Sequence, residues 1–138
     1  MGSMSGLLVL LALAAPILSL EGAVQLAQAY LGQQAEPYKV ELKAEKRPLY
    51  WEVRLGGFEV WVEATRGQVV QVRPKPPPPH TREPHLPFAE ALRRARLELG
   101  EVEKLELKPK ERLLVWEAKG GGREVWLEAR TGRVVRRE

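Results

Sequence analysis

The sequence has no cysteine, no aspartate and no asparagine among its 138 residues. The absence of cysteine excludes disulfide bonds and thiolate metal sites, although it leaves the cellular compartment open, because many exported bacterial proteins lack cysteine. All 18 acidic residues are glutamate, and arginine outnumbers lysine by 14 to 8. The scarcity of thermolabile residues, together with many Glu, Arg and Pro side chains, indicates a thermophilic source or, alternatively, a GC-rich genome.

Histidine is also scarce, which limits the chemistry open to the chain. The two histidines, His80 and His85, lie in a proline-rich stretch, so a Ser-His-carboxylate arrangement would need a linker histidine to reach a rigid partner. The spacing of His80, Glu83 and His85 matches no fixed metal site. We therefore expect no catalytic residues, no metal site and no cofactor, and we expect that the protein is not an enzyme.

Two stretches of the chain are nearly the same. Residues 49–73 read LYWEVRLGGFEVWVEATRGQVVQVR, and residues 114–138 read LVWEAKGGGREVWLEARTGRVVRRE. They align without a gap at a shift of 65 residues, and 13 of the 25 positions are identical, where chance would give about one or two. The chain therefore contains two copies of one small unit.

Each copy has the pattern of three antiparallel strands. Apolar and polar residues alternate on both sides of a Gly-Gly pair, which suits a two-residue hairpin turn because glycine tolerates a positive φ. This hairpin predicts facing pairs in both copies: Arg54 with Glu59, Val53 with Val60, Trp51 with Val62, Lys119 with Glu124, Ala118 with Val125, and Trp116 with Leu127. A three-residue turn ending at Gly67 would then set Val62 opposite Val70 and Val60 opposite Val72.

A helix is expected before each copy. Ser19 can cap the first helix and Gly32 can end it; its apolar stripe is Ala23, Leu26, Ala27, Tyr30 and Leu31. The second helix follows Pro87 and ends at Gly100; its stripe is Phe88, Ala91, Leu92, Ala95 and Leu99. We therefore predict an α+β fold of two tandem repeats, residues 19–73 and 87–138, each with one helix packed on an antiparallel sheet of three or four strands.

The segment between the repeats, residues 74–86, is a proline-rich linker. Four consecutive prolines, Pro76 to Pro79, favour an extended polyproline II conformation. The segment could dock into an aromatic groove, but we interpret it as a spacer. The whole net charge of +4 follows Arg73 and is concentrated near the C-terminus. Such charge could attract an acidic partner or anionic lipid, whereas nucleic acid is less expected because glutamates interrupt the basic residues.

The N-terminal residues 1–18 are predicted to be a signal peptide or an anchor. Met1-Gly2-Ser3 resembles a cloning remnant, and residues 6–20 form an apolar run of 15 residues, which is short for a membrane span of about 20. Ala12-Leu13-Ala14 resembles a signal cleavage site, although no basic residue precedes the run. The prediction is therefore a secreted or cell-envelope protein, with membrane association through residues 6–20 as one form of it; a buried N-terminal helix is the alternative.

The turn after the second strand of each copy carries a family resemblance. Residues 63–69 read EATRGQV and residues 128–134 read EARTGRV, and both resemble the end of the PepSY signature: an acidic residue, a small residue, a short turn with glycine, then valine. The family often has Asp where this chain has Glu63 and Glu128. The resemblance covers the chain from about Ser19 onward, and it implies an exported domain without catalytic residues that binds and restrains peptidases.

Two tryptophans fall on the polar side of the predicted sheets. Strand parity places Trp51 and Trp116 in the core and Trp61 and Trp126 on the opposite face. Tryptophan is a favoured interface anchor, so the candidate partner-binding residues are Trp61, Trp126, Tyr50 on the same face, and Arg136, which should lie opposite Trp126. Packing against neighbouring side chains is the alternative role for these tryptophans.

The predicted function is that of an exported, non-catalytic PepSY-type binding module. Its partner would be a protein, with a peptidase as the inhibited or regulated candidate in the cell envelope. A structural or scaffolding envelope protein without a peptidase partner is the alternative.

Overall fold

The structure is a computed structural model that describes residues 17–45 and 47–138. The predicted signal or anchor therefore lies outside the described residues, apart from Ile17 and Leu18. In chain order the elements are α2 (Leu20–Leu31), β1 (Lys39–Lys43), β2 (Tyr50–Leu55), β3 (Phe58–Glu63), β4 (Gln68–Pro74), η1 (Pro79–Arg82), α3 (Phe88–Leu99), β5 (Lys104–Lys110), β6 (Leu113–Gly120), β7 (Arg123–Glu128) and β8 (Val134–Arg137).

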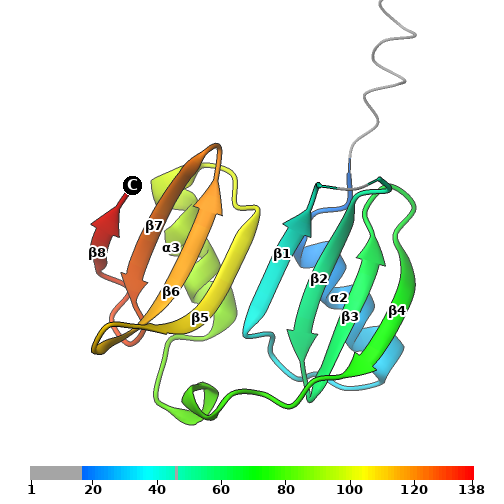
Figure 1. Ribbon diagram of the computed structural model, residues 1–138, viewed down its shortest axis with the longest axis horizontal. Coiled ribbons are helices and arrows are strands. Elements are labelled where there is room, and N and C mark those ends of the chain that lie inside the picture. The colour runs from blue at the N-terminus through cyan, green and yellow to red at the C-terminus, as the bar shows by residue number, and fades with distance from the viewer. Residues whose placement is uncertain (1–16, 46) are drawn as a thin grey trace, which may run out of the picture.

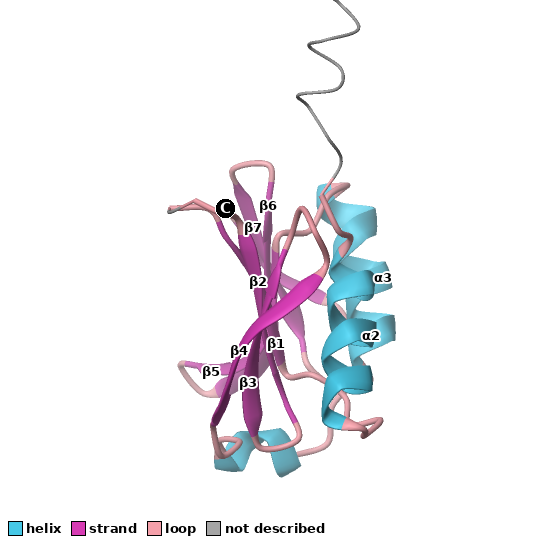
Figure 2. Ribbon diagram, turned by 90° about the vertical axis from the view of Figure 1, so that its right-hand side faces the viewer, coloured by secondary structure: helices cyan, strands magenta, loops and turns pink. Residues whose placement is uncertain are grey.

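The strands form one antiparallel sheet in the order β4-β3-β2-β1-β5-β6-β7-β8 (Figure 1). Within the described residues, α2 and α3 cover the same face of this sheet, and the other face carries no helix (Figure 2). The prediction of two tandem repeats, each with its own sheet, was therefore wrong, although the broad α+β class holds. Separate sheets would leave β1 and β5 as edges with unpaired backbone groups, and their pairing removes both edges.

The junction of the two halves is the antiparallel pair β1–β5. Val40 faces Leu105 there, Lys39 faces Glu106, and Glu41 faces Lys104. The side chains of Val40 and Leu105 are fully buried, so the apolar core continues from one half into the other beneath the two helices.

The hairpin predictions were confirmed in both halves. All six predicted pairs occur between β2 and β3 and between β6 and β7. Gly56, Gly57, Gly121 and Gly122 all have a positive φ, between 56° and 83°, as the tight hairpin turn requires. The polar and apolar faces of these four strands therefore follow from sequence parity alone.

The register of β4 differs from the prediction. Val60 faces Val72 as expected, but Val62 faces Val69 rather than Val70, because the pairing shifts by one residue next to Trp61. The extra residue of a β-bulge produces such a shift. As a result Val70 is left exposed on the edge strand.

The helices begin and end where the sequence indicated. The Ser19 side chain accepts a hydrogen bond of 3.0 Å from Gly22 N, and Gly32 ends α2 in the left-handed conformation. All five predicted stripe residues of α3 are buried. In α2 the buried stripe is instead Leu20, Ala23, Val24 and Ala27. The prediction for Tyr30 was wrong, because this stripe leaves its side chain on the solvent side and 64% exposed.

The linker packs against the second half of the sheet and is not only a spacer between the halves. Its residues Pro79–Arg82 form the 3₁₀ helix η1, and His80 Nε2 lies 2.9 Å from the Leu107 carbonyl oxygen of β5. The His85 ring meets the Trp116 ring edge to face at 5.8 Å. Both histidines are thus used in packing.

Candidate binding face on the helix-free side of the sheet

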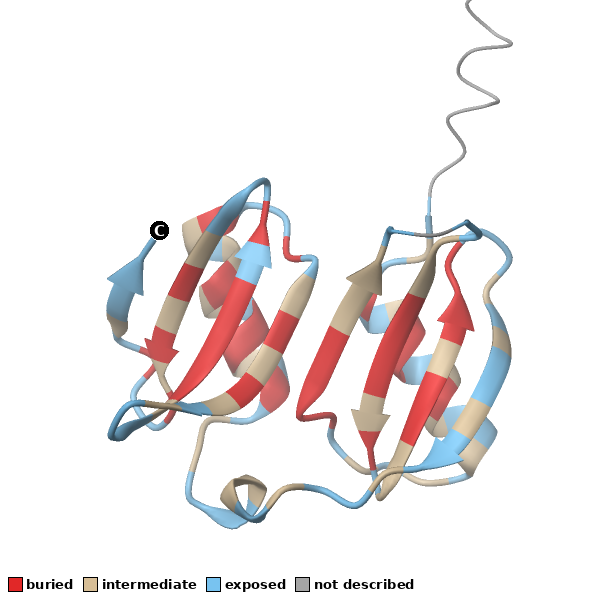
Figure 3. Cartoon of the chain, in the orientation of Figure 1, coloured by how far each residue is buried: buried red, intermediate tan, exposed pale blue. Residues whose placement is uncertain are grey.

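The helix-free face is tightly filled although its residues are mostly charged. Figure 3 shows buried residues throughout the middle strands and exposed residues on the edge strands β4 and β8. Three glutamates of this face, Glu52, Glu59 and Glu117, are at most 4% exposed. Buried carboxylates need partners, and here neighbouring strands supply cations.

The first half of the face holds two linked ion-pair groups. Glu59 of β3 lies 3.0 Å from Arg54 of β2 and 2.6 Å from Arg73 of β4. Glu52 of β2 lies 2.9 Å from Lys39 of β1 and 3.4 Å from Arg54. Arg54 therefore joins both groups, and the ion pairs run across four neighbouring strands.

The second half repeats two of these four contacts at the equivalent positions, 65 residues later. Glu117 lies 2.7 Å from Lys104, as Glu52 does from Lys39, and Lys119 lies 3.4 Å from Glu124, as Arg54 does from Glu59. Glu117 also gains Lys110 at 2.8 Å. The repeat thus preserves these two ion pairs, whereas Arg73, which pairs with Glu59, is replaced by Glu138.

These contacts lower the pKa of two of the carboxylates, Glu117 and Glu59. Burial alone would raise the pKa of Glu117, but hydrogen bonds from Lys104 and Lys110 outweigh it and lower the pKa to about 2. Burial would likewise raise the pKa of Glu59, and hydrogen bonds from neighbours that include Arg54 and Trp61 bring it to about 2. At neutral pH the face is therefore a fixed pattern of paired charges.

Trp61 lies in this pattern, partly exposed, as the parity argument placed it. Its indole Nε1 donates a hydrogen bond of 3.0 Å to Glu59, two residues earlier on β3. The Tyr50 ring of β2 stacks on it at 4.5 Å with an interplanar angle of 17°. Arg73 lies over the same ring system at 5.9 Å. The structure thus brings together two of the candidate residues, Tyr50 and Trp61.

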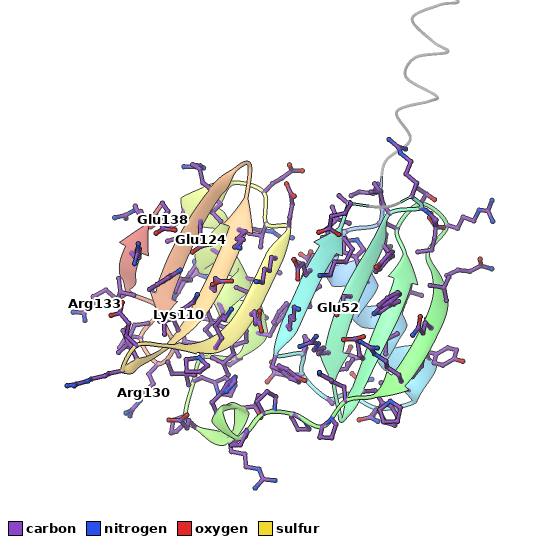
Figure 4. The ribbon with its side chains drawn as sticks, viewed as in Figure 1. Glu52, Lys110, Glu124, Arg130, Arg133 and Glu138 are labelled. Carbon is purple, nitrogen blue, oxygen red and sulfur yellow. The ribbon has the colours of Figure 1, made fainter. Side chains whose placement is uncertain are left out.

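Trp126 is the equivalent residue of the second half and is also partly exposed. Its indole Nε1 donates a hydrogen bond of 2.7 Å to Glu124. The predicted pairing with Arg136 was confirmed, and the Arg136 guanidinium lies 4.8 Å from the ring centroid. Lys110 Nζ lies at 4.8 Å as well, and Figure 4 shows Lys110 and Glu124 on the helix-free face.

Sequence reasoning missed Lys110 and Arg73 as neighbours of the tryptophans. Arg73 could have been found, because the strand alternation of β4 puts it on the same face as Trp61. Lys110 could not, because it is the last residue of β5 and reaches Trp126 only where the β5–β6 hairpin curls away from the helices (Figure 2).

The other two tryptophans are core residues, as predicted. Trp51 and Trp116 are 3% and 0% exposed. The Trp51 indole donates a hydrogen bond of 2.9 Å to the Leu18 carbonyl. Among the described residues, the buried Trp116 indole nitrogen has no hydrogen-bond acceptor. The two equivalent core tryptophans therefore differ, because only the Trp51 indole nitrogen has a hydrogen-bond acceptor among the described residues.

The acidic residue of the repeated turn has a structural role. The Glu63 carboxylate accepts hydrogen bonds from the backbone nitrogens of Thr65 and Arg66 at 3.0 and 2.8 Å. Glu128 accepts from Arg130 and Thr131 at 3.1 Å each. These bonds explain why the pattern of an acidic residue, a small residue and a turn recurs.

The opposite side of the sheet carries a groove of about 560 Å³ between α2 and α3. Apolar residues such as Val24, Phe88 and Leu92 line it, and Arg96 crosses it to pair with Glu21 at 2.5 Å. Within residues 17–45 and 47–138, no cluster of three potential metal ligands occurs. In the same ranges, no helix combines the length and the apolar character needed to cross a bilayer.

No family model matches the chain, and no curated protein matches it by sequence. Among solved structures the chain is similar to a candidate lipoprotein from Clostridium difficile 630, with 11% sequence identity and a TM-score of 0.49. The alignment covers 88% of this chain and 92% of that chain. This likeness is too weak to carry an argument about fold family, location or function, so the PepSY resemblance stays a prediction from the residues.

Proposed function

We propose that the protein is an exported, non-catalytic binding module of the PepSY type, and that its helix-free sheet face covers part of a protein partner in the cell envelope. A peptidase is the first candidate partner, on the strength of the repeated turn sequence. The observation that carries the proposal is the presence of Trp61 and Trp126 at equivalent, partly exposed positions on this face.

Two physical features support binding by this face. Tryptophan contributes a large contact area and often dominates interface energies. The surrounding charges are already paired and ordered, as in the contacts of Glu59 and Glu117. Binding therefore immobilises few side chains, which lowers its entropic cost.

The test is inhibition of metallopeptidases from the same organism by the full chain. Trp61→Ala and Trp126→Ala should each weaken binding by roughly 30-fold or more, as expected for an anchor worth about 2 kcal/mol. Tyr30→Ala removes an exposed aromatic from α2, behind the sheet, and serves as the matched control that should change nothing.

Each result separates one interpretation from another. Equal loss in all three variants would indicate a general effect of surface aromatics and would contradict the proposed face. Full inhibition by both tryptophan variants would place the binding surface elsewhere. If no peptidase is bound and a partner is captured only as part of an envelope assembly, the structural alternative is favoured.

A further inference from the structure

The surroundings of Trp61 and Trp126 differ at several equivalent positions. Tyr50, which stacks on Trp61, is replaced in the second half by Val115. Gln71, which faces Trp61, is replaced by Arg136, and Arg73, which lies over Trp61, is replaced by Glu138. Lys110, whose sequence equivalent is Glu45, lies over Trp126. In the second half, the aromatic cover of the tryptophan is therefore absent, and the side chains of Lys110 and Arg136 lie over the ring instead.

The smaller residue at position 115 coincides with a hollow of about 350 Å³ beside Trp126. This volume lies at the lower end of the range of ligand pockets, about 300–1,000 Å³. The hollow extends from the β5–β6 hairpin to the edge strand β8, and its lining residues are Lys110, Glu111, Arg112, Leu113, Val115, Trp126, Val135 and Arg136. Leu113 and Val135 are 42% and 37% exposed, so the hollow offers apolar contacts as well as an indole.

The lining is basic. Three of its side chains, Lys110, Arg112 and Arg136, are cationic, and only Glu111 opposes them. Lys110 shares its charge with Glu117, and Arg136 pairs with Glu138. Arg112 is exposed and, in the described part of the chain, has no carboxylate within ion-pair distance. The hollow therefore favours a ligand with negative charge.

We infer that this hollow binds an extended segment of the protein partner in which an aromatic side chain is flanked by carboxylates. The aromatic ring displaces the Lys110 ammonium group from the Trp126 ring and stacks there as Tyr50 stacks on Trp61 within the same chain. The carboxylates pair with Arg112 and Arg136. The adjacent strand β8 is an edge of the sheet, so its outer backbone groups can pair with an extended segment. This inference rests on the proposed function, because it specifies the partner chemistry for the same face.

The probe is the peptide acetyl-Glu-Glu-Phe-Glu-Glu-amide, added to the ¹⁵N-labelled full chain. The four indole N–H signals are assigned with the four Trp→Phe variants. We expect a saturable shift of the Trp126 signal and none of the Trp61 signal, with binding that weakens as salt is added. The control peptides replace Phe by Ala, or every Glu by Lys, and should each bind at least tenfold more weakly.

Two substitutions test the site itself by replacing a residue of the second half with its equivalent from the first half. Val115→Tyr should fill the hollow and abolish peptide binding. Because Val115 is fully buried and the larger ring could disturb folding, Arg136→Gln provides an independent test at an exposed position, with an expected loss of about fivefold. The matched control is Arg73→Gln, which removes the cation over Trp61 and should leave peptide binding unchanged.

The inference fails if the Phe and Ala peptides bind equally, or if Arg73→Gln weakens binding as much as Arg136→Gln. It also fails if the Trp126 signal does not shift at about 10 mM peptide, because even a weak complex of millimolar affinity would be populated at that concentration. The proposed function is distinguishable from it. Loss of partner binding in Trp61→Ala or Trp126→Ala, with no response to the peptide, would keep the binding face and remove only the acidic aromatic segment.

Discussion

Val40 and Leu105 face each other where β1 pairs with β5, and they occupy equivalent positions of the two repeats. The neighbours follow the same symmetry, since Lys39 faces Glu106 while Glu41 faces Lys104. An approximate two-fold axis therefore passes between Val40 and Leu105. The arrangement is that of an isologous interface, here formed within one chain.

The first prediction is that both halves unfold together. Each repeat is close to the lower size limit for an independent core, and Leu105 is fully buried at the junction. Leu105→Ala should lower the free energy of unfolding by about 2–5 kcal/mol and should shift one single transition. Differential scanning calorimetry checks this, because a single transition gives equal calorimetric and van't Hoff enthalpies. Two thermal transitions, of which Leu105→Ala shifts only one, would contradict the prediction.

Much of this fold follows from local sequence patterns. The period-two alternation around Trp51 and Trp61, with glycine pairs at the turns, defined the hairpins and the side of the sheet on which each tryptophan lies. The joining of β1 to β5 could not be predicted, because nothing in the alternation of Lys39–Lys43 indicates which distant edge that strand meets. Edge pairing is a long-range choice between equally suitable strands.

The candidate site was predictable only in part, for a related reason. Strand parity predicted the face on which Trp126 lies, and the strand register predicted that Arg136 lies opposite it. The approach of Lys110 depends on the curl of a hairpin, and the exposure of Val70 depends on a one-residue bulge next to Trp61. Neither feature has a distinct pattern in the sequence.

A second prediction contrasts the two core tryptophans. Trp51→Phe removes the donor of the hydrogen bond to the Leu18 carbonyl, which should cost about 0.5–1.5 kcal/mol beyond the change in packing. Trp116→Phe removes a buried indole nitrogen that has no acceptor among the described residues and should cost clearly less. Urea unfolding of both variants measures the difference, and equal losses would show that this hydrogen bond contributes nothing net.

A third prediction concerns the second hairpin. Gly122 has a φ of 76° and open space where a side chain would extend, so only backbone conformation restricts the position. Gly122→Val should therefore destabilise the protein by about 1 kcal/mol or more, whereas Gly122→Asn should cost less because asparagine tolerates the left-handed region. Thermal unfolding of both variants provides the measurement, and the prediction would be wrong if valine and asparagine were tolerated equally.

A fourth prediction concerns the N-terminal apolar segment. Deleting residues 1–16 should leave the melting temperature nearly unchanged, because the deletion retains Leu18, whose backbone nitrogen donates to Ala64 O at 2.7 Å. Deleting residues 1–19 serves as the comparison. It removes this bond and the Ser19 cap, and it should cost at least about 1 kcal/mol. A large loss on deleting residues 1–16 would instead favour a buried N-terminal helix and would contradict the predicted signal or anchor.

The fifth prediction follows from the lowered pKa of Glu117. This carboxyl has an ordinary pKa of 4.5 and a pKa of about 2 in the folded chain, so the unfolded chain binds its proton first as the pH falls. Its ionised contacts therefore contribute stability that is fully present above about pH 4.5 and is lost as the pH falls toward 2. The free energy of unfolding should decrease over this window.

The matched substitutions are Glu117→Gln and Glu98→Gln. The first removes the titrating group between Lys104 and Lys110, so it should lower stability at pH 7 and should flatten the acid-side decrease. The second changes an exposed pair with Arg137 on the helix side, and it should leave the slope nearly intact because exposed pairs contribute little. Urea unfolding at several pH values between 2 and 7 measures these slopes. If the acid-side slope in Glu117→Gln equals that of the parent chain, then Glu117 has the same pKa in the folded and the unfolded chain. The cations on this face would then not stabilise its charge.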